Sequence, residues 1–258
     1  MHVFRPQRSQ HQALDALAFG ICRMKVNYIV DCDIRGFFDS LNHEWLLRFI
    51  EHRIGDPRII RLIRKWLKAG VLVDNQWQAT EVGSPQGSVI SPLLANVYLH
   101  YCFDQWTHWW RGHGAHGQVV YVRYADDIVA GFEHAEDAQR FLANLRTRLE
   151  KFALTLHPEK TRLLEFGRFA ASNRARRRLG KPETFDFLGF THIAGRSRDG
   201  RFQLKRKTRR DRMRATLQRV KGELRRRMHD PIPAQGKWLG QVVRATLRIT
   251  RYRPTPVV

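Results

Sequence analysis

Three aspartates occupy positions from which carboxylates could bind divalent cations. Asp33 follows the apolar run at 28–30, and Asp126 and Asp127 lie between two β-rich runs. Mg2+ prefers such hard oxygen ligands and needs only one or two carboxylates besides substrate phosphates. Two ions about 3.5 to 4 Å apart can activate a hydroxyl and hold a triphosphate during phosphoryl transfer. The pattern therefore indicates metal-assisted nucleotidyl transfer, although aspartate is also common in ordinary turns.

These acids need rigid elements to bring them together. The β-rich runs at 119–124 and 128–132 predict a tight hairpin with the two acids at its tip. Apolar residues at helical spacing predict helices near 13–17, over 45–67 with a break at 55–57, over 92–103 and over 138–152. The order of strand, helices, hairpin, helix and short strands predicts an α+β fold with a mixed sheet and helices on one face.

The charge balance of the 258 residues predicts a polyanionic partner. The 46 Lys and Arg against 24 Asp and Glu leave a formal charge of +22, and cations that neutralise phosphates bind nucleic acid without regard to sequence. A basic membrane-surface protein is the alternative. No apolar run of about 18 residues and no secretory layout are present, so we expect a soluble, cytoplasmic protein. The three cysteines lack the spacing of a disulfide framework or a thiolate zinc site.

Four ordered motifs resemble the reverse transcriptases encoded by group II introns, which are bacterial retron-type RNA-directed DNA polymerases. The resemblance covers about residues 4–230. The motifs are Asp33-Ile34-Arg35-Gly36-Phe37-Phe38-Asp39, Ser84-Pro85-Gln86-Gly87-Ser88, Tyr124-Ala125-Asp126-Asp127 and Phe187-Leu188-Gly189-Phe190. The resemblance implies a polymerase palm at 26–195 that includes fingers insertions. A residual fingers segment at 1–25 and a partial helical thumb or maturase region at 196–258 would flank it, as in a chain truncated at both ends.

The resemblance also implies how the acids act. Asp33 and Asp126 would bind two Mg2+ ions, with Mn2+ as a substitute, and the Ile34 carbonyl would be a further ligand. Asp127 would be the supporting acid of the hairpin. Asp31 is the rival of Asp33, but it matches a variable position of the family. Lys160 would stand near the pyrophosphate leaving group as a general acid, and an exposed structural lysine is an equally open interpretation.

Further residues are implied to contact the substrates. Phe38 matches the bulky side chain under the nucleotide sugar, which would favour deoxynucleotides, and a core phenylalanine is its alternative. The other expected nucleotide-binding residues are Ile34, Arg35, Gly36, Phe37, Gln86 and Gly87. The segment Phe187, Leu188, Gly189 and Phe190 would grip the primer, or could form the core of a β-hairpin. Expected RNA-binding residues are Arg5, Arg8, Arg206, Lys207, Arg209 and Arg210, for which a solvated basic face is the alternative.

The resemblance thus implies an RNA-directed DNA polymerase of a group II intron type element. Its partners would be an RNA template, a DNA primer, deoxynucleoside triphosphates and intron RNA, with a further role in splicing. An inactive, RNA-binding maturase-like fragment is the second hypothesis. A nucleotide cyclase with a palm-like fold is a distant third, because its acids normally lie in a Gly-Gly-Asp context.

Overall fold

The computed structural model describes residues 9–69, 71–73, 76–78, 83 and 90–250. Its helices are α1 (Gln10–Arg23), α2 (His43–Glu51), α3 (Pro57–Lys68), α4 (Ser91–Leu99), the π-helical turn η1 (His100–Asp104), α5 (Gln105–His113), α6 (Ala135–Glu150), α7 (Ala170–Arg176), α8 (Arg210–Arg226) and α9 (Ile232–Thr250). Its strands are β1 (Tyr28–Cys32), β2 (Val71–Val73), β3 (Gln76–Gln78), β4 (Val119–Tyr124), β5 (Asp127–Phe132), β6 (Arg162–Glu165), β7 (Thr184–Phe187), β8 (Phe190–Arg196) and β9 (Phe202–Thr208). The fold is α+β, as the sequence predicts.

A four-stranded sheet in the order β4-β5-β1-β6 lies at the centre of the fold. Val30 of β1 pairs with Ala130 of β5 on one side and with Leu163 of β6 on the other, and both neighbours run antiparallel to β1. β4 and β5 form the predicted hairpin. The described pairings are therefore all antiparallel, which corrects the expectation of a mixed sheet. β5 and β6 both return against β1, so no parallel crossover arises among these strands.

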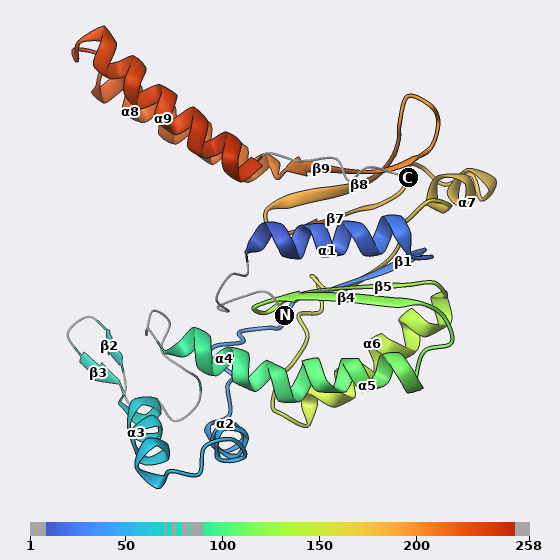
Figure 1. The fold of residues 1–258 in the computed structure, drawn as a ribbon, viewed down its shortest axis with the longest axis vertical. Helices are drawn as coiled ribbons and strands as arrows, with labels where there is room; N and C mark the ends of the chain where they lie inside the picture. The colour runs from blue at the N-terminus through green and yellow to red at the C-terminus, as the bar shows by residue number, and fades with distance from the viewer. Residues whose placement is uncertain (1–8, 70, 74–75, 79–82, 84–89, 251–258) are drawn as a thin grey trace.

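Both faces of this sheet are covered, because side chains alternate along each strand. Val30 and Cys32 enter one core with α2 to α6, whereas Ile29 enters a second core with α1 and the sheet β7-β8-β9. In Figure 1, α4, α5 and α6 lie below the central sheet and α1 lies above it. The expectation of helices on one face is thus corrected, since the apolar side of α1, including Leu14 and Leu17, covers the other.

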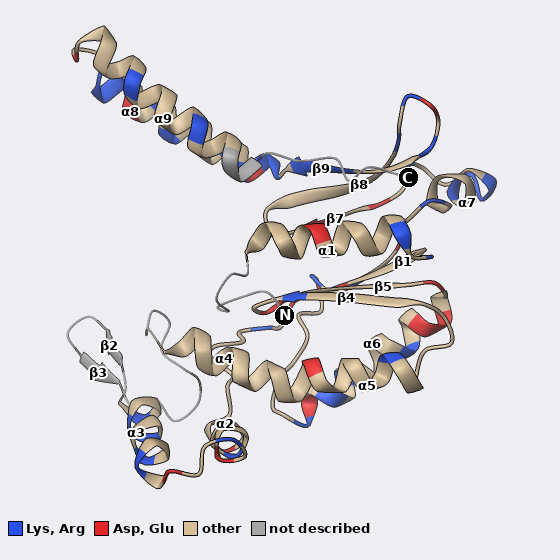
Figure 2. Ribbon diagram, in the orientation of Figure 1, with Lys and Arg blue, Asp and Glu red and all other residues tan. Residues whose placement is uncertain are grey.

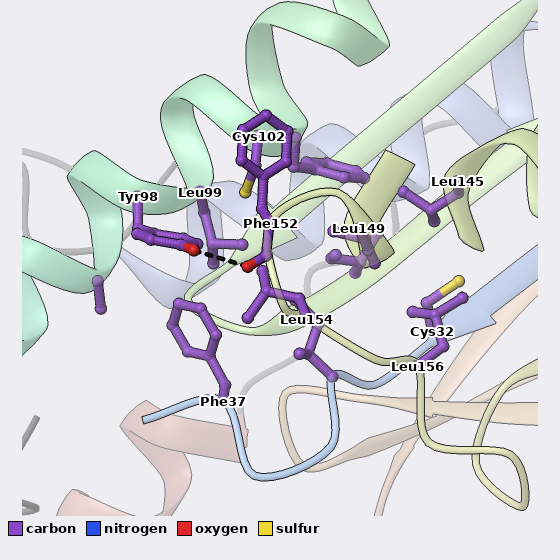
Figure 3. Packing of buried hydrophobic residues seen from close by; sticks show 14 of the residues in the cluster. Cys32, Phe37, Tyr98, Leu99, Cys102, Leu145, Leu149, Phe152, Leu154 and Leu156 are labelled. Carbon is purple, nitrogen blue, oxygen red and sulfur yellow. Dashed lines mark hydrogen bonds between the residues drawn. The ribbon is translucent and has the colours of Figure 1, made fainter. Parts of the chain in front are cut away.

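The larger core makes a rigid backing for β1 and the segment after it. Figure 3 shows Cys32 of β1 next to Leu156, with Leu145 and Leu149 of α6 in the same cluster and Phe152 on its far side near Tyr98. The hydroxyl of Tyr98 donates a hydrogen bond of 2.6 Å to the Phe152 carbonyl, so this buried polar group is satisfied. Each fully buried apolar side chain in this core stabilises the folded state by about 1.5 to 3 kcal/mol.

The helix boundaries follow local signals in the sequence. Ser9 and Gln12 cap α1 by bonding reciprocally to each other's backbone N–H groups. Asp56 caps α3 and Pro57 occupies its first position, which confirms the predicted break at 55–57. The hydrophobic spacing that predicts a helix over 138–152 corresponds to α6, with Phe141, Leu145 and Leu149 buried.

The helix expected over 92–103 is much longer than predicted. α4 passes through the π-helical turn η1 into α5, which ends at His113 before Gly114. Residues 105–113 hold no proline to stop the helix, and the buried ring of Trp110 anchors its far end. The extra residue in a π turn shifts the register of the helix. Asp104, at the end of η1, accepts a hydrogen bond from the Arg123 side chain of β4.

The last part of the described chain projects from the body. β7, β8 and β9 form a second antiparallel sheet, after which α8 and α9 run side by side away from it (Figure 1). No residue of α8 is buried. Among the described residues, no helix has the length and apolar character needed to span a membrane.

Candidate active site

The β4–β5 hairpin holds two acids at its tip. Tyr124 pairs with Asp127, and Ala125 and Asp126 make the turn between them. Ala125 has a φ of 57°, a left-handed conformation that residues with a Cβ rarely adopt. Such strain persists only where the surroundings hold it in place. The backbone just before Asp126 is therefore held by contacts outside the turn.

Arg123 provides that contact from inside the protein. Its side chain is fully buried and makes a bidentate pair with Asp104 of η1, at 2.8 Å and 2.6 Å. The same guanidinium donates to the Asn96 side chain at 3.2 Å and to the carbonyl oxygen of Ala125 at 2.9 Å. A helix, a strand and the strained turn thus meet at one buried cation.

Asp33 lies directly beyond β1 and contacts a lysine. Its backbone carbonyl accepts a 2.8 Å bond from the His157 N–H, while the bridge between Ile34 and Leu156 joins the two segments. This pairing brings Lys160 within 2.7 Å of the Asp33 carboxylate. The hydrogen bond and charge of Asp33 raise the pKa of Lys160, so the ammonium form is favoured at this point.

The three aspartates lie close enough to repel one another. Burial raises the pKa of Asp126, and the charge of Asp33 adds to that effect. Desolvation raises the pKa of Asp127 to about 6, with added effects of Asp126 and Asp33, although its side chain stays exposed to solvent. A cation between these groups would relieve the repulsion, so the acids form a site suited to positive charge.

The carboxylates do not by themselves form a complete metal cage. Among the described residues, no three His, Cys, Asp or Glu side chains converge closely enough to hold a metal ion. Mg2+ commonly takes only one or two carboxylates and completes its coordination with water and substrate phosphates. Asp33 and Asp126 fit that sparse donor set.

Asp31, the sequence rival of Asp33, has a different environment. It faces Arg162 of β6, its partner in the strand register, with a 3.2 Å ion pair. Desolvation raises the pKa of Asp31 to about 6, and Arg162 opposes the shift. Asp31 is therefore held within the sheet against Arg162, whereas Asp33 lies past the end of β1 with the exposed Lys160 as its partner.

The residues expected at the nucleotide lie in a turn that follows Asp33. Gly36 adopts a φ of 52°, and its carbonyl accepts bonds from the N–H groups of Asp39 and Ser40. Phe37 is 3% exposed and belongs to the larger core, whereas Phe38 is only partly buried. Of the two rings, Phe38 is the one with surface left for a substrate.

Four of the predicted site residues, Arg5, Arg8, Gln86 and Gly87, lie outside the described residues. Gly83, shortly before the expected Gln86 loop, contacts the turn after Asp33. Its N–H donates to the Leu41 carbonyl, and a Cβ at Gly83 would lie 2.8 Å from the carbonyl oxygens of Phe38 and Asp39. Its φ of 91° is also one that side chains disfavour.

The expected primer-grip residues form the turn between β7 and β8. Phe187, Leu188 and Phe190 are buried, which agrees with the hairpin-core alternative. Leu188 and Gly189 have positive φ values, and the Gly189 carbonyl accepts a bond from the N–H of Arg209. The guanidinium of Arg212 packs against Gly189, and its charge partly opposes the rise that burial causes in the pKa of Asp127. The turn is therefore coupled to the acidic site through Arg212.

The predicted RNA-binding arginines differ in accessibility. The Arg206 side chain is only 6% exposed and pairs with Asp15 of α1 at 3.1 Å, which leaves it little surface for RNA. Arg209 pairs with Asp211 at 2.7 Å. Lys207 and Arg210 are exposed.

Sequence reasoning missed two residues of this site. Arg123 interrupts the apolar strand β4 close to the tip. A cation within an apolar strand needs a buried partner, and that requirement is a signal from which Arg123 could have been predicted. Arg212 had no comparable signal, because it lies in a long basic run.

Comparisons with known proteins agree on one family and one fold. The profile of the family described as reverse transcriptase (RNA-dependent DNA polymerase) matches residues 1–192. The chain is 46% identical over 101 residues to the group II intron-encoded protein LtrA of Lactococcus lactis subsp. cremoris, covering 38% of this chain and 16% of LtrA. It is 29% identical over 234 residues to protein YkfC of Escherichia coli K12, covering 78% of this chain and 57% of YkfC.

The chain thus spans less than two thirds of either relative. Among solved structures, apo telomerase from Candida tropicalis, truncated from its C-terminal domain, superposes with a TM-score of 0.56 at 16% identity. That match covers 78% of this chain and 40% of the telomerase. At this identity the likeness concerns the fold alone.

Proposed function

Since the chain belongs to the reverse transcriptase (RNA-dependent DNA polymerase) family, we propose that it extends a DNA primer on an RNA template with deoxynucleoside triphosphates. The observation that carries the proposal is that Asp33, just past the end of β1, lies near enough to Asp126 and Asp127 at the start of the neighbouring strand β5 for their charges to interact, with Lys160 2.7 Å from Asp33. Residues 26–195 would be the palm, and residues 196–258 would begin the thumb.

Asp33 and Asp126 would hold two Mg2+ ions, for which Mn2+ can substitute, with the Ile34 carbonyl as a further ligand and Asp127 as a supporting acid. Burial, with the charges of neighbouring acids as a smaller cause, raises the pKa values of Asp126 and Asp127. A bound divalent cation would favour the charged carboxylates against both effects, which supports this assignment. When bound, the ions would lower the pKa of the primer hydroxyl and neutralise charge on the triphosphate.

Lys160 would bind the leaving pyrophosphate and donate the proton on Nζ to it. Its contact with Asp33 favours the charged ammonium form at neutral pH. Until the proton is transferred, the exchange of the Asp33 carboxylate for a phosphate oxygen would keep the ammonium paired with an anion, and after the transfer Lys160 would be a neutral amine. An exposed side chain, 62% accessible, can make that change without moving the core.

Phe38 would select the sugar. Its backbone lies against Gly83, while its partly buried ring contacts the ring of Phe37 at 5.4 Å between centroids. A ring held in this way cannot easily retreat from an additional 2′-hydroxyl, which favours deoxynucleotides over ribonucleotides.

A matched pair of substitutions tests the metal assignment. Asp33→Asn should abolish Mg2+-dependent primer extension, because Asp33 lies past the end of β1 within electrostatic reach of Asp126 and its partner Lys160 is exposed enough to move away. Asp31→Asn should retain extension, because Asp31 is held within β1 against Arg162 of β6. Circular dichroism and thermal unfolding would show that both variants fold. Loss of extension in Asp31→Asn with retention in Asp33→Asn would reverse the assignment.

Assistance to intron splicing is the second candidate function. Two observations favour it, namely the 46% identity to a group II intron-encoded protein over 101 residues and the net charge of +22. On this hypothesis, the chain binds intron RNA with strong salt dependence and without nucleotide incorporation. RNA binding by a parent protein that extends no primer with either Mg2+ or Mn2+ would favour it over polymerisation.

A further inference from the structure

α3 divides its surface into three lengthwise stripes. Its buried stripe consists of Ile60, Ile63 and Leu67, which pack into the larger core. A second stripe is apolar but open, with Ile59 43% exposed, Leu62 46% exposed and Trp66 43% exposed. The remaining arc of the helix is cationic and exposed, and it comprises Arg58, Arg61, Arg64, Lys65 and Lys68. α3 contains no acidic residue.

Three of these cations have no acidic partner within the described part of the chain. Arg58 pairs with the helix cap Asp56 at 2.9 Å, and Arg64 lies 3.9 Å from Glu51 of α2. Arg61, Lys65 and Lys68 make no ion pair with any described acid. We call these three residues the α3 ridge.

The spacing of the α3 ridge suits a line of negative charges. The residues follow each other at intervals of four and three positions, which places them on one side of the helix. At 1.5 Å per residue they span about 10 Å along the helix axis. A nucleic-acid strand carries one phosphate per about 3.4 Å of duplex axis, so about three phosphates fit the same length.

We propose that the α3 ridge binds the phosphate backbone of an RNA strand without regard to its sequence. The choice of RNA as the polyanion rests on the proposed function. An anionic membrane fits less well, because a helix lying on a membrane has its apolar face in the centre with cations on both sides. In α3 the cations lie on only one side of the open apolar stripe.

The α3 ridge is separate from the basic segment at the start of α8. Figure 2 shows basic residues on α3 at one end of the long axis and on α8 toward the other. An RNA that reaches both would therefore contact the protein across most of its length. The affinity of the protein for such an RNA should depend on the α3 ridge even where the rate of catalysis does not.

The test uses the full chain and its binding to labelled, structured RNA, followed by fluorescence anisotropy over a series of salt concentrations. The variant is Arg61→Gln/Lys65→Gln/Lys68→Gln, in which glutamine preserves helix propensity. The control variant, Arg111→Gln/Arg146→Gln/Lys151→Gln, removes the same charge from exposed positions near α5 and α6. Circular dichroism would verify that both variants remain folded.

In structured RNA, which holds both paired and single-stranded segments, three lost phosphate contacts should reduce the slope of log K against log salt by about 2 to 3. Affinity at about 0.1 M salt should fall by tenfold or more, with much less change in the control. Equal losses in both variants would mean that only net charge matters, and would overturn the proposal. An unchanged slope, or a loss of binding to phosphatidylserine vesicles instead of RNA, would also overturn it. Because no nucleotide is incorporated in this assay, its outcome does not depend on whether the chain polymerises.

Discussion

Replacement of Arg123 by methionine should destabilise the fold and displace the turn that carries Asp126. Methionine retains an apolar side chain of similar length, but it leaves the Asp104 carboxylate, 12% exposed, without its bidentate partner. Removal of one member of a buried ion pair typically costs about 3 to 5 kcal/mol. His100 lies 3.8 Å from Asp104 and can compensate in part, so we expect about 3 kcal/mol. That is a large part of a total stability of about 5 to 15 kcal/mol.

The double substitution Arg123→Met/Asp104→Leu separates stability from positioning. It removes the uncompensated acid, so urea unfolding should show that most of the lost free energy returns. The Ala125 carbonyl still lacks its donor, and a misplacement of about 1 Å in a reacting group can cost about 100-fold in rate. We therefore expect kcat for primer extension to stay low while KM changes little. Recovery of full kcat in the stable double variant would refute the positioning role of Arg123.

Three further predictions follow from other contacts. Burial lowers the pKa of His192 from 6.5 to about 3, so the unfolded chain binds the proton first as the pH falls. The contribution of His192 to the free energy of unfolding should therefore fall by about 1.4 kcal/mol per pH unit between about pH 6.5 and about pH 3. His192→Phe keeps a ring against Phe185, so urea titrations of this variant should show a weaker fall of the unfolding free energy with pH. An unchanged fall would contradict the role of His192. Gly83→Ala should lower the free energy of unfolding by about 1 to 3 kcal/mol, measured by thermal unfolding. The added Cβ would lie 2.8 Å from two carbonyl oxygens, and the φ of 91° disfavours a side chain. An unchanged stability would show that the turn moves to accommodate the methyl group. Phe38→Val should raise ribonucleotide incorporation relative to deoxynucleotides by about tenfold, and unchanged selectivity would mean that Phe38 is only a core residue.

Local signals in the sequence predict most of the central fold. The β-rich runs on either side of 125–127 predict the β4–β5 hairpin, and Asp56 with Pro57 predicts the start of α3. Such signals act over a few residues, where caps, turns and side-chain periodicity determine the backbone. They therefore place Asp126 and Asp127 at a hairpin tip before any tertiary contact is known.

Features that depend on distant contacts could not be predicted in this way. The sequence does not show that α1 covers the second face of the sheet, or that a π turn shifts Asp104 to meet Arg123. Lys160 is 127 residues from Asp33 in the chain, and their contact depends on the pairing of Ile34 with Leu156. The family resemblance indicates Lys160 as a candidate, but the ion pair is visible only in the structure.

Mg2+-dependent extension of a DNA primer on an RNA template, compared between the parent chain and Asp126→Ala, is the most direct test of the proposed polymerase site. The removal of one of three mutually repelling carboxylates should leave the fold and RNA affinity intact. We predict extension by the parent and none by the variant, with equal RNA binding by both. Extension by Asp126→Ala at the parent rate would contradict the assignment of these aspartates to catalysis.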